Sequence, residues 1–428
     1  MEPIVLVGGG LASARAAETL RDEGYDGDVV VVTAEPHHPY ERPPLSKDLL
    51  RGDAERDVVF PLDGTWYGRH DVEVRRGTLA VGLDPAAHTL TFADGGSLAY
   101  SRCLIATGSS PRSLDIPGTD LGGVHYLRTL DDCDRLSQVL LDASLEGSGR
   151  IAVIGDGWIG LEVAASARTL GLEATVIGRG AVPLGRVLGA EMGELFAGLH
   201  TERGTRVIRN TDAVRILGAD SRVTGVQLPD GTRVDADIVV IGVGATPNVG
   251  LAEVAGLDLR SGELGGGIAV DGTLSTSHPD VFAAGDVASI PSPHYGRPLR
   301  VEHWAGASDG GTHAARAMLG NRAPYDSLPF FYTDQYDLGM EYIGWVGPGD
   351  GTGSGSGGGQ GRVTRDGYDD VVVAGSVAKR ELVAFWVLDG RVRAGMAVNV
   401  WEQVDRIKEL ILSGRQVPRE ELEGFTAA

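Results

Sequence analysis

Two stretches of the chain share one pattern: a short apolar run, a glycine-rich turn, and then small residues at helical spacing. They read IVLVGGGLASARAAETL, from Ile4 to Leu20, and IAVIGDGWIGLEVAASARTL, from Ile151 to Leu170. Another apolar run follows each of them, DVVVVTAE at residues 28–35 and EATVIGR at residues 173–179. Because the order strand, helix, strand occurs twice, the sequence predicts an α/β fold with two Rossmann-like nucleotide-binding domains.

The glycines of both turns have the GxGxxG spacing, which binds a pyrophosphate at the N-terminus of a helix. The complete second copy consists of Gly155, Gly157 and Gly160. The first copy has Gly8 and Gly10, but Ser13 holds the third place, where a small residue serves helix–strand packing. One copy alone is explained equally well by helix packing, whereas two copies inside βαβ patterns predict two bound dinucleotides.

The strand after each helix normally ends in an acidic residue that hydrogen-bonds a ribose. Glu35 holds that place in the first unit, whereas the second unit has Gly178 and Arg179 and no carboxylate there. A glycine leaves room for a 2′-phosphate and an arginine can pair with one, which favours NADPH. A solvated surface arginine explains Arg179 equally well, so the choice between NADH and NADPH stays open.

Charge and cysteine content exclude several classes of function. The net charge of -21 argues against a nucleic-acid partner, since phosphate binding needs basic surface. No apolar run approaches the ~20 residues that span a bilayer, and the start MEPIVLVGGG lacks a basic signal-peptide segment, so we expect a cytoplasmic protein with no membrane partner. Cys103 and Cys133 form no CxxC or CxxxxC pair, which argues against a redox dithiol and a metal site.

Beyond the two βαβ units, three apolar runs also end in glycine turns. They are CLIATG at 103–108, DIVVIGVG at 237–244 and VFAAGD at 281–286. After Gly320 the pattern changes: residues 376–399 alternate and predict antiparallel strands joined by an Asp-Gly turn, with a last helix over 400–413. The glycine–serine run at 347–362 predicts a mobile loop. We therefore expect a third, C-terminal α+β domain.

The stretch ERPPLSKDLL, residues 41–50, places two prolines just before Lys47. Each proline fixes its own φ and disfavours helix for the residue before it. The stretch therefore predicts a stiff turn that opens a helix and holds Lys47 in one position.

Taken together, the motifs resemble those of the FAD-dependent NAD(P)H:ferredoxin reductases of the glutathione-reductase-like superfamily. In chain order they are GGGLASARAAETL, PYERPPLSK, LIATGSSPR, LRTLDD, GDGWIGLE, GVGATPN, VFAAGD, RVEHW and DQYD. The resemblance implies FAD as cofactor, NADH or NADPH as substrate, and a ferredoxin as acceptor that serves a cytochrome P450 or an oxygenase. It also implies a discontinuous FAD-binding domain at 1–115 and 247–328, an NAD(P)-binding domain at 116–246 and an interface domain at 329–428.

The same resemblance gives catalytic roles to Lys47, Glu162 and Tyr332. Lys47 would lie by the flavin, where a cation stabilises the negative charge that arrives with a hydride. Glu162 would be its partner across the domain boundary, and Tyr332 would be the aromatic residue that closes over the flavin, where relatives often have tryptophan. Asp286 would accept hydrogen bonds from the ribityl chain, although it also fits a helix N-cap.

The other carried-over residues are cofactor contacts. For FAD they are Gly8, Gly10, Ala12, Glu35, Arg42, Lys47, Ala80, Thr107, Gly108, Arg128, Asp286, Val301, Glu302, His303 and Trp304. For the nicotinamide dinucleotide they are Gly155, Gly157, Ile159, Gly160, Arg179 and Gly244. We expect no acid–base role for His303.

Two departures from related enzymes bear on the acceptor. Disulfide reductases of this superfamily carry a cysteine pair where this chain has RPPLSK, so electrons must leave by another route. Ferredoxins are typically acidic, as this chain is, so docking one requires a local basic patch. Candidates for that patch are Arg69, Arg75, Arg76, Arg297 and Arg300.

Two other functions fit the same motifs. One is an NAD(P)H oxidase or a monodehydroascorbate-type reductase. The other is a redox-sensing binding protein like apoptosis-inducing factor. The sequence does not predict the oligomeric state.

Overall fold

The computed structural model describes residues 2–147, 149–262, 265–347 and 367–425. The chain forms two compact units. Unit 1 contains residues 1–43, 55–110 and 245–329, and unit 2 contains residues 44–54, 111–244 and 330–428. Of the glycine–serine run, residues 348–362 lie outside the described residues.

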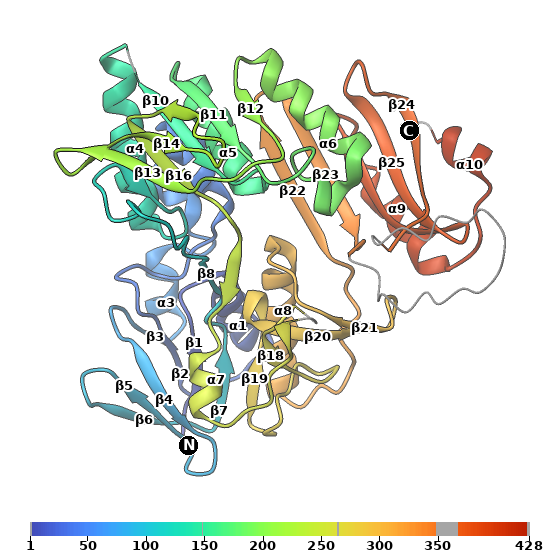
Figure 1. The fold of residues 1–428 in the computed structure, drawn as a ribbon. Helices are drawn as coiled ribbons and strands as arrows, with labels where there is room; N and C mark the ends of the chain where they lie inside the picture. The colour runs from blue at the N-terminus through green and yellow to red at the C-terminus, as the bar shows by residue number, and fades with distance from the viewer. Residues whose placement is uncertain (1, 148, 263–264, 348–366, 426–428) are drawn as a thin grey trace. The chain divides into compact units, whose positions relative to one another are not determined.

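Unit 1 is built on a five-stranded parallel sheet with the order β19-β7-β1-β2-β3 (Figure 1). Its strands are β1 Ile4–Val7, β2 Val29–Val32, β3 Val72–Arg75, β7 Arg102–Ile105 and β19 Val281–Ala283. Its helices are α1 Leu11–Asp22, η2 Arg56–Val59, α3 Gly64–Arg69, α7 Gly250–Val254, η4 Gly285–Val287 and α8 Trp304–Met318. Smaller sheets use β4 Ala80–Asp84, β5 Thr89–Phe92, β6 Ser97–Ala99, β18 Ile268–Ala269, β20 Ala288–Ser292 and β21 Arg297–Leu299.

The burial of its strands fits a parallel sheet at the centre of the unit. Every residue of β1 and of β2 is buried, as expected for strands covered on both faces. Each fully buried valine, leucine or isoleucine contributes about 1.5–3 kcal/mol of hydrophobic free energy. On the sheet, α1 and α8 lie side by side (Figure 1). Gly311 of α8 permits this close packing, since a Cβ there would overlap the backbone of Ala12. The first predicted βαβ unit is therefore confirmed.

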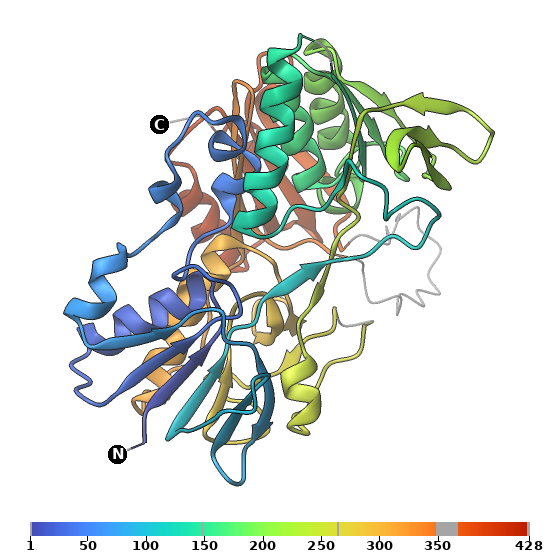
Figure 2. The ribbon, with the colours of Figure 1, turned by 90° about the vertical axis from the view of Figure 1, so that its left-hand side faces the viewer.

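Unit 2 contains a second parallel sheet with the order β12-β11-β10-β16-β9. Its strands are β9 Val124–His125, β10 Arg150–Ile154, β11 Glu173–Ile177, β12 Arg206–Ile208 and β16 Ile238–Ile241. The helices of this fold are α4 Leu130–Leu145, α5 Trp158–Thr169 and α6 Gly185–Glu202. A small antiparallel sheet of β13 Arg215–Ala219, β14 Arg222–Gln227 and β15 Arg233–Asp235 projects from its side (Figure 2). The second predicted βαβ unit, β10-α5-β11, is confirmed.

The C-terminal part of unit 2 is an antiparallel sheet with the order β22-β23-β26-β25-β24. Its elements are β22 Phe330–Gln335, β23 Leu338–Gly344, β24 Asp370–Ser376, β25 Glu381–Leu388, β26 Arg391–Val398, α9 Val404–Ser413 and α10 Arg419–Glu423. The hairpin β25–β26 confirms the predicted antiparallel strands. At the borders of the units, β8 Ser109–Pro111 and β17 Ala245–Pro247 form a two-stranded ladder.

Two local predictions need correction. The helix predicted over 400–413 is α9 and begins at Val404, because Glu402 has a positive φ of 63°, which an α-helix cannot contain. It is also not the last helix, since α10 follows it. The stretch after the two prolines is not the start of one helix. It consists of the 3₁₀ turn η1, Pro43–Ser46, and the single turn α2, Asp48–Arg51, separated by Lys47 in a non-helical conformation.

The borders of the two units fall near some of the predicted domain borders, at residues 110/111, 244/245 and 329/330. The division into three domains stays a prediction. Within the described ranges, no helix combines the length and the hydropathy needed to cross a bilayer.

Candidate functional site

The first glycine turn joins β1 to α1 in unit 1. Backbone conformation and packing require glycine at one of its positions but not at the other. Gly8 has a φ of 141°, and a Cβ there would overlap the backbone oxygen of Ala106. Gly10 has an ordinary φ of -109°, and no described atom lies within 4 Å of where its Cβ would be. The fold therefore requires glycine at Gly8 but leaves open space at Gly10.

The second turn, between β10 and α5 in unit 2, repeats this division. Gly155 has a φ of 120°, and a Cβ would overlap the backbone oxygen of Gly242. A Cβ on Gly160 would overlap the oxygen of Gly155. At Gly157, φ is -85° and no described atom comes within 4 Å of a Cβ position.

The open glycine of each turn is the N-cap of a helix, and no described side chain caps either helix. Free N–H groups at a helix N-terminus, next to a position without a Cβ, form the site to which a pyrophosphate binds. Neither a positive φ nor packing requires glycine at Gly10 or Gly157, so both positions leave room for the close approach of a ligand. Both turns thus fit a dinucleotide.

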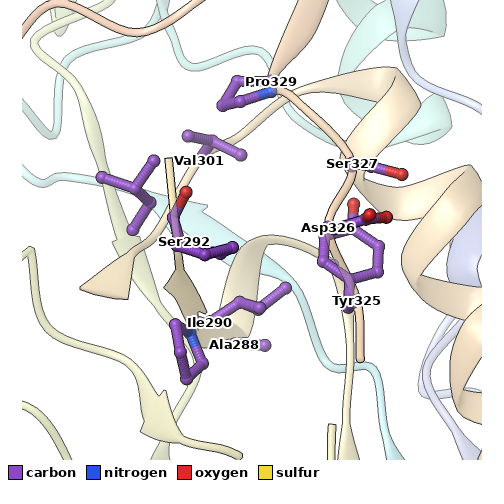
Figure 3. Close-up of a pocket in the computed structure, with 13 residues that line it drawn as sticks. Ala288, Ile290, Ser292, Val301, Tyr325, Asp326, Ser327 and Pro329 are labelled. Carbon is purple, nitrogen blue, oxygen red and sulfur yellow. The ribbon is translucent and has the colours of Figure 1, made fainter. Parts of the chain in front are cut away.

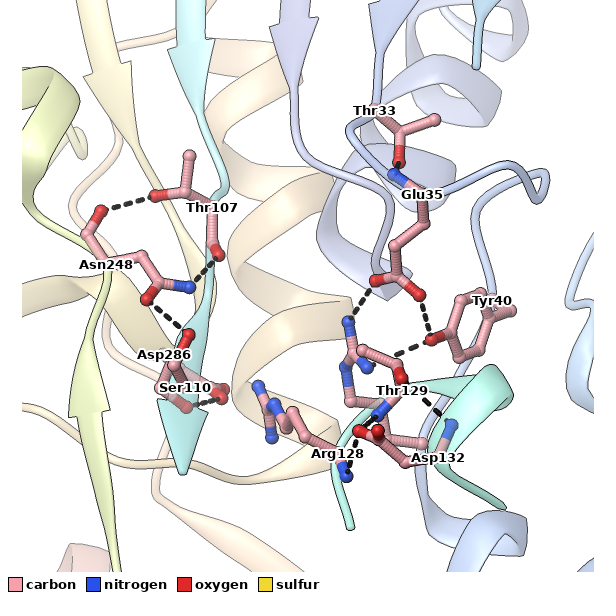
Figure 4. Close-up of polar contacts among 12 residues, drawn as sticks. Thr33, Glu35, Tyr40, Thr107, Ser110, Arg128, Thr129, Asp132, Asn248 and Asp286 are labelled. Atoms are coloured by element: carbon pink, nitrogen blue, oxygen red, sulfur yellow. Dashed lines mark hydrogen bonds and ion pairs between the residues drawn. The ribbon is translucent and has the colours of Figure 1, made fainter. Parts of the chain in front are cut away.

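Glu35 lies just past β2, as expected for a ribose-binding acid, but it already has protein partners. Arg42 lies 3.0 Å from Glu35 Oε1, and Tyr40 donates its hydroxyl to Oε2 at 2.5 Å (Figure 4). Arg42 also donates to the Tyr40 hydroxyl at 3.1 Å. This triad fixes the carboxylate, which can still accept from a ribose because an ionised carboxylate has about four lone-pair sites.

Thr107 and Gly108, at the end of β7, are held by Asn248. The Thr107 hydroxyl donates to the Asn248 backbone oxygen at 2.8 Å, and the Asn248 amide donates to the Thr107 oxygen at 2.8 Å (Figure 4). Ser110 donates to Asn248 Oδ1 at 2.7 Å. Asn248 was not among the predicted residues, although it stands in the motif GVGATPN, which could have pointed to it.

Asp286 lies inside η4 and not at its N-cap, so the alternative of a helix cap is wrong. Its Oδ2 accepts a hydrogen bond from Ser109 at 2.8 Å. Gly285, with a φ of 75°, precedes it and packs toward Ala12 of α1. His303 is the N-cap residue of α8, and burial lowers its pKa to about 4, although Asp286 opposes that shift.

A pocket in unit 1 lies next to these residues (Figure 3). Val301, predicted to lie near FAD, contributes to its lining, together with Gly285 and with Gly306 of α8. Ser292 of the β20–β21 hairpin and Tyr325 also line it, and Figure 3 shows their side chains around the same hollow.

The remaining predicted FAD residues are dispersed over several elements. Trp304, the first residue of α8, donates its indole N–H to Glu41, and Glu302 pairs with Arg300 at 2.7 Å. Ala80 begins β4. In unit 2, Arg128 immediately precedes the Thr129–Asp132 capping box of α4, and its backbone N–H donates to Asp132 at 3.2 Å (Figure 4).

Unit 2 contains the residues against which Lys47, just after the two prolines, is held. Lys47 Nζ lies 2.8 Å from Glu162 Oε2 of α5, and Ser46 donates its hydroxyl to the same oxygen at 2.5 Å. Ser166, also on α5, donates to the Ser46 backbone oxygen at 2.8 Å. The predicted pairing of Lys47 with Glu162 is present. It forms inside one compact unit, because residues 44–54 pack on α5, and not across a boundary between units.

Strand β22 completes the surroundings of Glu162. Thr333 donates its hydroxyl to Glu162 Oε1 at 2.5 Å, so three donors hold a carboxylate whose side chain is only 4% exposed. Tyr332, the neighbouring residue, has its ring centroid 6.0 Å from Lys47 Nζ, within cation–π range. Burial raises the pKa of Asp334, Lys47 opposes the rise, and the Glu162 carboxylate adds to it.

The hydroxyls of Ser46 and Thr333 were not predicted. Both residues stand in motifs that pointed to their neighbours, PYERPPLSK and the stretch before DQYD. The only signal in the sequence was that each stands next to a predicted catalytic residue, Ser46 beside Lys47 and Thr333 beside Tyr332.

Near the second nucleotide turn, Arg179 donates a hydrogen bond through Nε to Asp212 Oδ2 at 2.6 Å. Ile159, in the first turn of α5, is 44% exposed. Gly244 follows β16 with a φ of 108°. The Asp156 side chain lies over Gly178, a feature that the sequence did not predict.

Both cysteines, Cys103 of β7 and Cys133 of α4, are buried and form no disulfide, and burial raises the pKa of Cys103 to about 12. Neither thiol is exposed, as redox exchange requires. Among the residues that the structure describes, no group of three or more His, Cys, Asp or Glu could hold a metal ion.

Three of the five arginines predicted as a docking patch are paired with carboxylates of their own unit. The pairs are Arg69–Asp63 at 2.9 Å, Arg75–Glu73 at 2.7 Å and Arg300–Glu302 at 2.7 Å. Each pair reduces the positive charge that its arginine offers to a partner. The docking patch stays a prediction.

Known proteins resemble the chain over nearly its whole length. A family model described as pyridine nucleotide-disulphide oxidoreductase matches residues 2–311. The anthranilate 1,2-dioxygenase system ferredoxin–NAD(+) reductase component of Burkholderia cepacia is 36% identical over 417 residues, covering 96% of this chain and 95% of that protein. A ferredoxin–NAD(P)(+) reductase of Sphingomonas sp. is 34% identical over 412 residues, covering 95% and 92%. The crystal structure of the covalent putidaredoxin reductase–putidaredoxin complex has a TM-score of 0.87 at 30% identity, covering 99% of this chain and 95% of the other.

Proposed function

The chain belongs to the pyridine nucleotide-disulphide oxidoreductase family, and we propose that it is an FAD-dependent reductase that passes electrons from NADH or NADPH to a ferredoxin. The observation that carries the proposal is the pair of open glycines, Gly10 and Gly157, each at an uncapped helix N-terminus. Two dinucleotide sites on one chain suit a flavin and a nicotinamide. Relatives that match over nearly the full length are named ferredoxin reductases, which supports a ferredoxin as acceptor.

The residues of unit 1 fit FAD. The turn at Gly8 and Gly10 suits its pyrophosphate, and Glu35 suits a ribose, with Arg42 and Tyr40 holding the carboxylate in place. FAD, when bound, supplies a ring that takes two electrons from a nicotinamide and releases them one at a time. The two buried, separate thiols support this single-electron route over a dithiol route.

Lys47 is the residue that assists flavin reduction in this proposal. A fixed positive charge stabilises the negative charge that a hydride brings, without proton transfer. The ion pair with Glu162 and the hydroxyl of Ser46 support this role, because they hold the ammonium and its counter-ion in one arrangement. Tyr332 stays a predicted aromatic contact of the flavin.

Turnover with and without an acceptor tests the proposal. The purified protein is expected to be yellow, to be bleached anaerobically by NADH or NADPH, and to reduce members of a ferredoxin panel that includes putidaredoxin. Colourless protein that gains no flavin absorbance on adding FAD contradicts the cofactor. Reoxidation by oxygen or a quinone as fast as by every ferredoxin indicates the oxidase or quinone-type alternative. A reduced complex that persists, with turnover below about 1 s⁻¹, indicates a redox-sensing protein.

The role of Lys47 has its own test. Lys47→Ala is expected to slow anaerobic flavin reduction in stopped-flow measurements while the flavin spectrum and FAD content stay normal. An unchanged reduction rate would remove the electrostatic role. Replacement of Arg233, an exposed arginine of the same unit paired with Asp235, by alanine is a suitable control.

A cytoplasmic location is part of the proposal. Two cysteines that form no disulfide fit a reducing compartment, where disulfides are rare.

A further inference from the structure

We propose that Asp156, in the second glycine turn, replaces the carboxylate missing from the end of β11 and makes the site select NADH over NADPH. The inference rests on the proposed function, because it concerns the dinucleotide that this turn would bind. It reverses the preference that Gly178 and Arg179 suggest from the sequence alone.

The first observation is where the Asp156 carboxylate lies. A Cβ on Gly178, the residue directly after β11, would overlap Asp156 Oδ2, Cγ and Cβ. Gly178 lacks the positive φ that would demand glycine, so the Asp156 side chain is the reason for a glycine there. The carboxylate thus occupies the space of a side chain at the strand end, where the ribose-binding acid of such folds stands.

The second observation is that the protein holds this carboxylate in place. The backbone N–H groups of Asp156 itself and of Gly180 face the carboxylate. Separately, the Asp156 backbone oxygen accepts from the Leu184 N–H at 3.0 Å. Burial raises the pKa of Asp156, while the N–H donors and the charge of Arg186 oppose the rise. Two backbone donors leave lone pairs on a carboxylate that can accept from a ribose hydroxyl.

The third observation concerns the arginine expected to bind a 2′-phosphate. Arg179 donates through Nε to Asp212 at 2.6 Å, so its charge is already compensated. A 2′-phosphate would have to share Arg179 with the Asp212 carboxylate. It would also bring about 1.5 to 2 negative charges close to Asp156.

A carboxylate at this position favours NADH over NADPH. The 2′-hydroxyl of NADH donates a hydrogen bond to the carboxylate, as the ribose does to a strand-end acid. The 2′-phosphate of NADPH has no such donor and is repelled by the same charge. Discrimination by a site that hydrogen-bonds a substrate hydroxyl is commonly large, so we expect at least a tenfold preference for NADH.

Two measurements on the FAD-loaded protein test the inference. The first compares the rates of flavin reduction by NADH and NADPH. The second measures, by isothermal titration, the binding of ADP-ribose and 2′-phospho-ADP-ribose to the oxidised protein, which requires no electron transfer. In the native protein both are expected to favour the form without the phosphate at least tenfold.

Asp156→Asn keeps the shape of the side chain and removes its charge. The preference ratio is expected to fall at least tenfold in both measurements. The matched control is Asp220→Asn in the β13–β14 hairpin, an exposed residue with a φ of 50°, a conformation that asparagine tolerates. It should leave the ratio unchanged.

Asp212→Asn tests whether Asp212 keeps Arg179 from binding a phosphate. It also provides a test if Asp156→Asn does not fold. Releasing Arg179 from its carboxylate is expected to improve binding of 2′-phospho-ADP-ribose severalfold and to leave ADP-ribose binding unchanged. No improvement would overturn the view that Asp212 holds Arg179 away from a phosphate.

The outcomes separate this inference from the proposed function. A native preference for NADPH, or an Asp156→Asn ratio equal to that of the native protein, overturns the inference while flavin reduction still supports the reductase. If neither nicotinamide reduces the flavin, the proposed function fails, and the fragment titrations still show whether Asp156 discriminates against the phosphate.

Discussion

Replacing Lys47 by methionine tests how unit 2 holds its buried charges. The change removes the ammonium but keeps most of the apolar length of the side chain. Glu162, only 4% exposed, then loses its cation and keeps the hydroxyl donors Ser46 and Thr333. A buried carboxylate without a cation is strongly disfavoured, so the folded state should lose stability.

The geometry gives the magnitude. At 2.8 Å and an effective dielectric constant of about 20, the gross attraction between Lys47 and Glu162 is about 6 kcal/mol. Part of this is recovered, because the lysine no longer has to be desolvated. Breaking a buried pair typically costs about 3–5 kcal/mol, and the two remaining hydroxyl donors place this pair at the lower end, about 3 kcal/mol. For a unit of this size that corresponds to about 6–12 °C in Tm.

Thermal unfolding of the FAD-loaded protein, followed by circular dichroism, measures the effect. The double variant Lys47→Met, Glu162→Gln has no buried charge left in the pair, so it should recover most of the lost Tm. Arg233→Met, which breaks a pair with both side chains about half exposed, is the control and should change Tm little. A loss of less than about 2 °C for Lys47→Met, or additive effects in the double variant, would refute the reasoning.

Three further predictions follow from single positions. Gly8→Ala should destabilise the fold, whereas Gly10→Ala should leave circular dichroism unchanged and lower FAD affinity, because only at Gly10 is the space around a Cβ free of protein; equal flavin content in both variants contradicts this. Burial lowers the pKa of His303 to about 4, below its unfolded value of about 6.5, so stability should be complete above pH 6.5 and decline toward pH 4. His303→Leu should show a smaller decline in denaturant titrations at several pH values, and an identical pH profile would count against it. Gly178→Ala places a Cβ against Asp156 and should raise the KM for NADH without altering the flavin spectrum; an unaltered KM would show that Asp156 is not used.

Much of the fold could be predicted from the sequence because the signals are local. Continuous apolar runs such as Ile4–Val7 give buried parallel strands, and a glycine turn before small residues gives the following helix. The helix start predicted at residue 400 was wrong because a single residue with positive φ, Glu402, leaves no periodic signal. The candidate residues of the two turns were identified in the same local way.

The partners of those residues could not be predicted in that way. Asn248 holds Thr107 from 141 positions away, and Thr333 reaches Glu162 from 171 positions away. Contacts between side chains so distant in sequence leave no pattern of spacing or composition. The pairing of Lys47 with Glu162 was predicted only through the resemblance to a known family.

By itself, the sequence determined that this chain forms two nucleotide-binding folds with a glycine turn in each. This is because backbone conformation and burial depend mainly on residues that are close together in sequence. The tertiary structure alone decided which charges meet: Lys47 with Glu162, Arg179 with Asp212, and Asp156 over Gly178. The physical reason is that electrostatic interactions depend on distance in space. A glycine and an arginine that favour a phosphate when read along the chain are, once folded, covered by one carboxylate and paired with another.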